Sequence, residues 1–335
     1  MNSRERVIAT LNYDHPDRLP RDIWALPYVR EKRSDEYNIL ISQYPGDFLG
    51  VSPDYPPGIY FPSSFQEIGT YQDEWGSVWQ VAEAGIIGEV KKPALDNWSK
   101  LSQYNPPWDL IKKRRWDNVN RICEQSNLFT ICGATVRIFE RMQFLRGTEN
   151  LFTDIAFGTA EFRQLLTILQ EFYLEDLYGW CKSNVDAIYM MDDWGTNQRL
   201  LINPKTWREI FKPIYQQFCN VIHSAGKYVF FHSDGNIQSI YGDLIEVGVN
   251  AINSQLFTMD IEALGLDYKG KVTFWGEIDR QHILPFGTPQ EVRQAVHRVR
   301  KALHSEKGGV IAQCEWGKFD PIENIQMVYK TWLEE

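Results

Sequence analysis

Short apolar runs alternate with longer amphipathic segments from about residue 127 to the end of the chain. The runs are continuously apolar, which is typical of parallel strands buried on both faces, and the longer segments have helical spacing. The runs lie at 128–135, 185–193, 227–235, 250–255, 271–279 and 309–317, and the main helical segments at 159–183, 204–225, 236–247 and 289–305. This alternation predicts a parallel sheet covered by helices.

The N-terminal third is less regular. Residues 3–12 predict a short amphipathic helix that begins at a serine cap, and residues 107–126 predict another helix. Residues 43–66 are rich in Pro, Gly and Tyr and predict an irregular loop, whereas 69–80 and 85–90 predict a hairpin or strand pair. We therefore expect extra N-terminal helices and loops.

Polar residues gather where the predicted strands end. The ends are Gly133-Ala134-Thr135, Asp192-Asp193, His232-Ser233-Asp234, Asn253-Ser254-Gln255, Glu277-Ile278-Asp279 and Gln313-Cys314-Glu315. A buried strand cannot carry charge along its length without a partner, whereas (β/α)8 barrels place catalytic groups at the carboxyl ends of their strands. Open doubly wound sheets also bind ligands there, but the chain has no GxGxxG or GxxxxGK[ST] motif. We predict one (β/α)8 TIM barrel domain over residues 1–335.

Charge and composition exclude several classes of function. The net charge of −9 disfavours nucleic acid and anionic membranes as partners. No apolar run approaches the roughly 18–20 residues that cross a bilayer, and the charged N-terminus has no signal-peptide pattern. The five cysteines are scattered without a CxxC motif, which argues against a disulfide framework. We expect a cytoplasmic protein that acts on a small molecule.

Four residues at the strand ends are candidate metal ligands. His232 and Asp234 lie two apart on one strand, so their side chains share a face, and Glu277 and Cys314 end later strands. Zn²⁺ accepts imidazole, carboxylate and thiolate, and a catalytic zinc keeps one of its positions open. The pattern predicts a zinc site formed by three of these four residues.

Other roles follow from neighbouring positions. We expect Asp192, Asp234 and Glu277 to be catalytic. The candidate substrate-binding residues are Asp193, Trp194, Arg137, Trp75 and Tyr189. Alternative roles stay open for three of these residues. Cys314 could be a buried core thiol, and Glu277 could form an ion pair with Arg280 or Arg137. Asp193 could cap the following helix.

The same segments carry a family resemblance over nearly the whole chain. They are SRERVIATLNYDHPDRLP (3–20), MMDDWGTNQRLLINPKTWREIFKPIY (190–215), FFHSDGNI (230–237), FWGEIDRQHILPFGTPQEV (274–292) and CEWGKFDPIENI (314–325). The chain resembles the uroporphyrinogen decarboxylase superfamily, and within it the branch of cobamide-dependent (corrinoid) methyltransferases. The resemblance implies a (β/α)8 barrel.

In that branch a His-x-Cys pair and a later Cys hold zinc. His232 and Cys314 match the first and last of these ligands, whereas Asp234 replaces the middle Cys. Glu277 stands where many relatives have Gly, and it could supply a replacement ligand. A ligand set richer in carboxylate would make the zinc more Lewis acidic and would suit oxygen activation.

The resemblance implies a zinc-dependent methyltransferase that moves a methyl group between a small methylated compound or thiol and a corrinoid partner protein. One alternative is a metal-free decarboxylase of the uroporphyrinogen type, in which Asp192 or Asp73 would stabilise a protonated pyrrole. The segment 22–27 lacks the Arg pair of those decarboxylases. A barrel that binds a small molecule or corrinoid without turnover is a third possibility, and the aromatic residues in 43–66 allow a homodimer.

Overall fold

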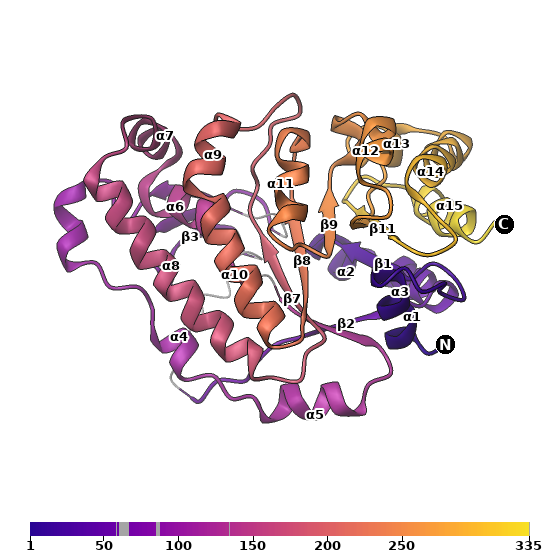
Figure 1. Ribbon diagram of the computed structural model, residues 1–335, viewed down its shortest axis with the longest axis horizontal. Coiled ribbons are helices and arrows are strands. Elements are labelled where there is room, and N and C mark those ends of the chain that lie inside the picture. The colour runs from indigo at the N-terminus through magenta and orange to yellow at the C-terminus, as the bar shows by residue number, and fades with distance from the viewer. Residues whose placement is uncertain (58, 60–66, 85–87, 134, 335) are drawn as a thin grey trace.

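Eight parallel strands form one sheet in a computed structural model that describes residues 1–57, 59, 67–84, 88–133 and 135–334 (Figure 1). The strands are β1 (Arg21–Ala25), β2 (Phe48–Val51), β6 (Phe129–Cys132), β7 (Ala187–Met191), β8 (Tyr228–Ser233), β9 (Ala251–Ser254), β10 (Thr273–Trp275) and β11 (Val310–Trp316). Their order is β1-β11-β10-β9-β8-β7-β6-β2.

The two ends of this sheet approach each other. The Asp47 amide, just before β2, donates to the carbonyl oxygen of Arg21 at the start of β1 over 2.8 Å. The Arg21 amide donates in turn to Asp47 Oδ2 over 2.7 Å. The sheet is thus a nearly closed barrel, and the predicted (β/α)8 fold is confirmed.

All six predicted strands are present, but β1 and β2 were not predicted. The expectation of an irregular loop over 43–66 is corrected, since β2 pairs in parallel with β6 from Phe48 opposite Phe129 to Val51 opposite Cys132. This strand is only four residues long and lies among Pro and Gly, so its pattern is that of a turn. Residues 58 and 60–66 of the predicted loop lie outside the described residues.

The N-terminal segment closes one end of the barrel. Helix α1 (Ser3–Leu11) begins with a capping box between Asn2 and Glu5. Its Val7 and Leu11 pack with Phe129 and Phe230 in the interior cluster of the barrel. Helices α2 (Pro27–Lys32) and α3 (Ser34–Gln43) follow β1. The amino ends of the strands are therefore sealed by apolar side chains.

A small antiparallel sheet replaces the predicted hairpin. Its strands are β3 (Gly69–Gln72), β4 (Val78–Val81) and β5 (Glu89–Lys92), in that order. The prediction of paired strands in this region is borne out, with a third strand added. Residues 85–87 and Ala134, which belonged to predicted strand segments, lie outside the described residues.

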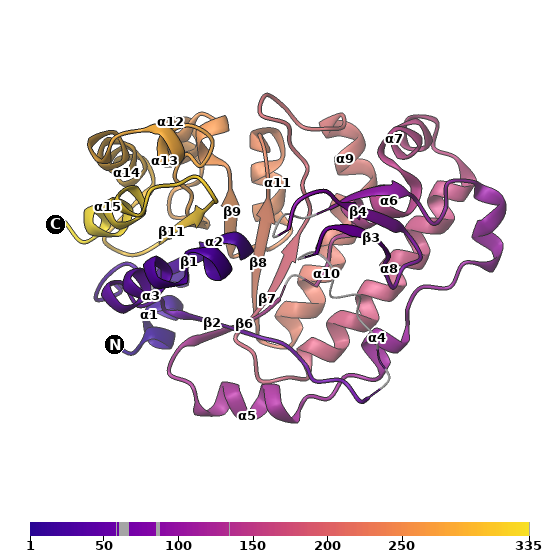
Figure 2. The same ribbon diagram turned by 180° about the vertical axis from the view of Figure 1, so that it is seen from behind.

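Helices surround the barrel (Figures 1 and 2). They are α6 (Ile138–Arg146), α7 (Thr148–Phe157), α8 (Ala160–Cys181), α9 (Pro204–Ile210), α10 (Lys212–Ser224), α11 (Tyr241–Glu246), α12 (Ile261–Tyr268), α13 (Ile283–Phe286), α14 (Pro289–Leu303) and α15 (Ile322–Trp332). Shorter connecting elements are η2 (Trp98–Gln103), α4 (Asp109–Lys112), α5 (Asp117–Gln125), η3 (Gln238–Ile240) and η4 (Leu256–Thr258). None of the described helices has both the length and the apolar character needed to span a bilayer.

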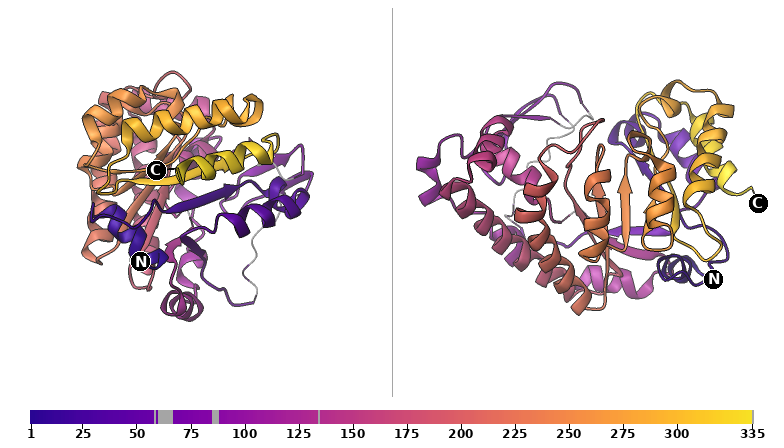
Figure 3. Two further views of the ribbon diagram at one scale, coloured as in Figure 1. Left: turned by 90° about the vertical axis from the view of Figure 1, so that its right-hand side faces the viewer. Right: turned by 45° about the horizontal axis from the view of Figure 1, so that its top comes forward.

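Side chains alternate along each strand between the barrel interior and the layer of outer helices, so the apolar residues form two clusters. Phe230, Trp275 and Ile311 lie in the cluster inside the barrel, whereas Phe231 and Ala312 pack against the outer helices. Figure 3 shows the strands enclosed by the helical layer from two further directions. Because successive side chains point to opposite faces, residue parity decides which side chains reach the mouth of the barrel.

Candidate functional site

His232 lies at the end of β8 with its imidazole inside the barrel mouth. It shares a strand face with the interior residue Phe230. Its Nδ1 lies 2.6 Å from Asn253 Oδ1, while Asn253 Nδ2 donates to the Trp275 carbonyl over 2.5 Å and to Gln313 over 3.1 Å. The amide oxygen of Asn253 can only accept, so Nδ1 carries a proton, and Nε2 is the ring nitrogen that faces the mouth.

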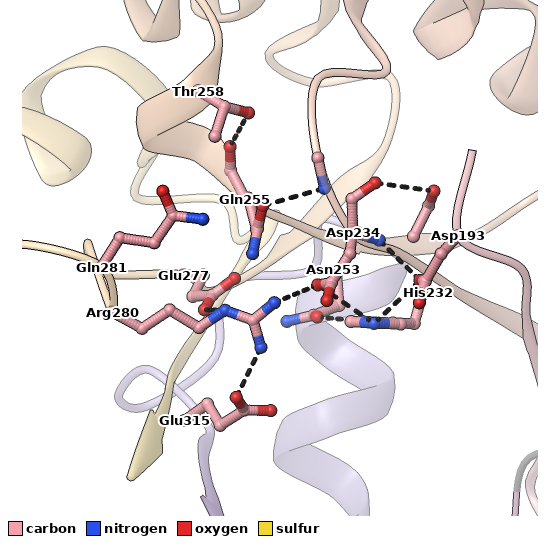
Figure 4. Close-up of polar contacts among 12 residues, drawn as sticks. Asp193, His232, Asp234, Asn253, Gln255, Thr258, Glu277, Arg280, Gln281 and Glu315 are labelled. Atoms are coloured by element: carbon pink, nitrogen blue, oxygen red, sulfur yellow. Dashed lines mark hydrogen bonds and ion pairs between the residues drawn. The ribbon is translucent and has the colours of Figure 1, made fainter. Parts of the chain in front are cut away.

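Two carboxylates face that nitrogen (Figure 4). His232 Nε2 lies 3.4 Å from Asp234 Oδ1 and 3.6 Å from Asp193 Oδ1. Asp193 Oδ1 also accepts the backbone N–H of Asp234 over 2.8 Å, which holds the two carboxylates side by side. Within the described ranges, these three residues are the group of His, Cys, Asp or Glu whose ligand atoms come close enough to share a metal.

The dimensions of this group fit a zinc ion. Ligand atoms about 2.0–2.1 Å from a tetrahedral zinc lie about 3.3 Å apart, close to the separations of 3.4 and 3.6 Å. The side chains of Asp193 and Asp234 are 34% and 33% exposed, so the group opens to the mouth. Three protein ligands and one open position are the arrangement of a catalytic zinc.

Arg280 connects this group to two further carboxylates (Figure 4). It forms ion pairs with Asp234 and Glu315, and its Nε lies 3.2 Å from Glu277 Oε1. Glu277 is buried, and its Oε2 has no hydrogen-bond partner among the described residues. Burial raises the pKa of Glu277 well above its usual range, and Arg280 opposes that rise. The structure thus places Glu277 beside Arg280 and outside the ligand group of His232.

The structure does not bring Cys314 to His232. Gln313 faces the barrel interior, where it accepts from Asn253, so Cys314 faces the helical layer. Its Sγ lies 3.5 Å from the hydroxyl of Tyr329 on α15, and burial raises the pKa of the thiol to about 12. The expectation that Cys314 and His232 hold one metal is corrected, because strand alternation places them on opposite faces of the barrel wall.

The structure places Asp192 and Asp193 differently, and the expected catalytic position of Asp192 is corrected. Asp192 is buried and accepts from the amides of Phe139 and Glu140 in the first turn of α6, and from the Tyr215 hydroxyl over 2.6 Å. Burial raises the pKa of Asp192 to about 6. Asp192 therefore caps a helix, and Asp193, the next residue, reaches the mouth.

Comparison with known proteins identifies the family. The sequence profile of the uroporphyrinogen decarboxylase (URO-D) family matches residues 77–333, which is most of the chain. The chain belongs to the URO-D family. No curated protein matches the sequence.

One solved structure shares the barrel fold of this URO-D family member, and a more distant one is also similar. A methyltransferase from Methanosarcina mazei superposes with a TM-score of 0.73 at 13% identity, over 99% of this chain and 98% of that one. Xylanase 10B from Thermotoga maritima gives a TM-score of 0.47 at 8% identity, over 99% and 98% of the two chains. At this identity the first likeness establishes the fold alone.

Aromatic side chains form one wall of the mouth in this URO-D family member. The ring of Trp24 lies 5.4 Å from that of His232, 6.0 Å from Tyr189 and 5.0 Å from Trp275. Tyr189 thus lies in the mouth, where it was expected. Trp24 and Trp275 were not among the predicted site residues.

The other predicted binding residues lie in different places. Trp194 is buried and stacks on Phe139 at 4.0 Å between the helices, and Trp75 packs against Phe172 with Arg141 over its ring. Neither tryptophan reaches the mouth, so their predicted role in substrate binding is corrected. Arg137 remains partly exposed beside the mouth, where Nη2 contacts Met191 Sδ at 2.8 Å.

Proposed function

We propose that the chain is a zinc-dependent methyltransferase that moves a methyl group between a small methylated compound or thiol and a corrinoid protein. The observation that carries the proposal is the convergence of His232 Nε2, Asp193 Oδ1 and Asp234 Oδ1 at an open barrel mouth. Zinc bound there would act as a Lewis acid toward the oxygen, nitrogen or sulfur that carries or accepts the methyl group.

The protein's own groups would prepare that chemistry. Asn253 fixes the imidazole in the tautomer with a free Nε2. Arg280 holds Asp234 from the outer side, and the backbone of Asp234 holds Asp193. Trp24 and Tyr189 offer apolar faces next to His232, which suit a methyl group and limit access of water. Each ligand therefore has a positioning contact.

Charge at the mouth argues against the decarboxylase alternative. A tetrapyrrole with many carboxylates needs several free guanidinium or amide donors. Here Arg280 is already engaged by Asp234, Glu277 and Glu315. Asp192 is held as a helix cap, and both oxygens of Asp73 accept from local N–H groups. We expect no conversion of uroporphyrinogen to coproporphyrinogen.

Metal content and transfer activity test the proposal together. Zinc binding is measured by calorimetry on chelator-treated protein and on His232→Ala, Asp193→Asn and Cys314→Ala variants. Methyl transfer from methylcobalamin to 2-mercaptoethanol is followed by the visible spectrum, with methylcobalamin standing in for the corrinoid partner. We expect stoichiometric zinc in the wild type and in Cys314→Ala, and loss of both zinc and transfer in the other two variants.

Two results would contradict the proposal. Substoichiometric zinc after reconstitution would remove its basis, as would zinc binding that His232→Ala leaves intact. Corrinoid binding without transfer to any thiol or from any methylated compound would instead favour a barrel that binds without turnover.

A further inference from the structure

A buried arginine lies at the other end of the barrel. Arg21 begins β1 and is 9% exposed. Its Nε is buried without a hydrogen-bond partner, and no ion pair or side-chain hydrogen bond is found for its guanidinium in the described part of the chain. By contrast, the nearby Arg6 and Arg18 each pair with Asp47, at 2.7 and 2.8 Å.

This arginine lines a cavity of about 410 Å³ between the start of β1 and the ends of α14 and α15. Figures 1 and 2 show these segments next to each other on the side where both chain termini lie. Arg18, Arg300 and His304 also line the cavity. Burial and the nearby charges of Arg18 and Arg6 lower the pKa of Arg21, and Asp47 opposes that change.

The acidic residues around Arg21 are shared with other cations or exposed. Asp47 raises the pKa of Arg21, but its carboxylate already forms ion pairs with Arg6 and Arg18. Asp17 is paired with Arg6 at 2.6 Å, and Glu334 with Arg293 at 2.9 Å. Glu306 is exposed. A buried charge that lacks a partner is costly, and a guanidinium presents a planar fork of donors that matches the oxygens of phosphate and carboxylate groups.

We propose that this cavity binds a small anion through a phosphate or carboxylate group, with Arg21 as the main contact and Arg18, Arg300 and His304 around it. The cavity is larger than an inorganic phosphate, so it suits a small phosphorylated or carboxylated metabolite. The site lies at the amino ends of the strands, opposite the mouth, and so is separate from the methyl-transfer chemistry proposed above.

Anion binding should strengthen closure of the barrel. The backbone N–H and carbonyl of Arg21 both bond to Asp47, which joins β1 to the start of β2. A ligand that binds only the folded protein raises its stability in proportion to the logarithm of ligand concentration. The melting temperature therefore reports the site without any assay of activity.

The first test compares anions on the full-length protein by scanning calorimetry. Inorganic phosphate and malonate represent the two oxyanion groups, and sodium chloride at matched ionic strength controls for screening. We expect one or both oxyanions to raise the melting temperature by an amount that grows with the logarithm of their concentration, and chloride not to do so. Equal shifts with chloride would overturn the proposal, while the better of the two oxyanions identifies the group recognised.

Variants assign the effect to the cavity. In Arg21→Gln we expect the oxyanion Kd to rise about tenfold or more, because a charge-assisted pair of hydrogen bonds contributes at least that factor. Without anion, this variant should be no less stable than the wild type, since it removes an unpaired buried charge. Arg121→Gln is the matched control, as its guanidinium is exposed on α5.

An unchanged oxyanion Kd in Arg21→Gln would overturn the assignment. If that variant gives no cooperative unfolding transition, Arg300→Gln provides the second measurement. Arg300 lines the same cavity at the end of α14, where it also donates to the Glu334 carbonyl. We expect a several-fold weaker oxyanion Kd, and an unchanged Kd would again contradict the proposal.

Discussion

His232 and Asn253 are joined by a contact of 2.6 Å between Nδ1 and Oδ1. The partner of Asn253 on the next strand, the Trp275 carbonyl, fixes which end of the amide is the oxygen. Three neighbouring strands of the barrel thus determine the tautomer of one imidazole. The metal affinity of the mouth should depend on this contact as well as on the ligands.

Substitution of Asn253 tests that dependence. Asn253→Ala leaves His232 Nδ1 without its acceptor, so zinc affinity should fall about 10–100-fold, as for other groups that orient a ligating histidine. Asn253→Asp keeps an acceptor for Nδ1 but loses the donor to the Trp275 carbonyl, so it should restore only part of the affinity. Calorimetric titration of the metal-free variants measures both values, and equal affinity in Asn253→Ala and the wild type would contradict the argument.

Arg280 should contribute strongly to stability because its removal leaves Asp234, Glu277 and Glu315 without their shared countercharge. Arg280→Met should lower the free energy of unfolding by about 3 kcal/mol. Adding Glu277→Gln should recover part of this loss, since the neutral amide does not need the guanidinium. Urea denaturation of the two single variants and the double variant gives the coupling energy. Strictly additive losses would show that Glu277 and Arg280 do not interact.

Asp22 should make stability depend on pH. Its Oδ2 accepts from the indole N–H groups of Trp24 and Trp275, at 2.8 and 2.9 Å, and burial raises its pKa to about 6. An unfolded Asp has a pKa of about 3.9, so the folded state binds the proton more tightly. This group therefore makes stability fall as pH rises from about 4 to 6, and its contribution is flat above that range.

Asp22→Asn should remove this dependence, because the amide oxygen still accepts from both indoles. We expect the variant to be more stable than the wild type by about 1–2 kcal/mol at neutral pH, with little difference near pH 4. Urea denaturation between pH 4 and neutral pH measures this difference in the free energy of unfolding. The substitution Asp109→Asn at an exposed position is the control. A constant difference between Asp22→Asn and the wild type at all pH values would contradict the assignment.

Cys314 should behave as a core thiol. Its burial and raised pKa predict that a thiol reagent modifies it only after unfolding, as seen by mass spectrometry of labelled peptides. Cys314→Ala should lower stability by about 1 kcal/mol without changing zinc binding. If the reagent modifies Cys314 rapidly in the folded protein and zinc prevents this, Cys314 is a zinc ligand and the prediction is wrong.

The sequence predicted the barrel and His232 for one reason. Long apolar runs that end in polar residues need little tertiary information, and such runs contain β6 to β11. Strands β1 and β2 were missed because four or five residues among turn formers carry too weak a pattern. Arg280 was named only as an alternative partner of Glu277, because it reaches the mouth from a loop and only the folded chain shows its contacts.

Strand parity would have improved the site prediction. Tyr189 and Met191 share a face with Asp193 and not with Asp192, and Ile311 shares a face with Gln313 and Glu315 and not with Cys314. Following alternate residues along each predicted strand would have placed Asp193 among the candidate ligands at the mouth and excluded Cys314. The resemblance to a His-x-Cys…Cys pattern favoured Cys314 by position alone, and position does not show which way a side chain points.

Helix α1 has a consequence for the order of events in the proposed reaction. Among the described residues, Val7 and Leu11 fill the amino end of the barrel, so the imidazole of His232 faces solvent at the opposite end, the mouth. Both reactants would then enter through the mouth. A corrinoid protein bound over the mouth would trap the small reactant in the site. The small reactant must then bind before the corrinoid protein and be released after it. This predicts an ordered kinetic mechanism in which the small molecule binds first and its product leaves last.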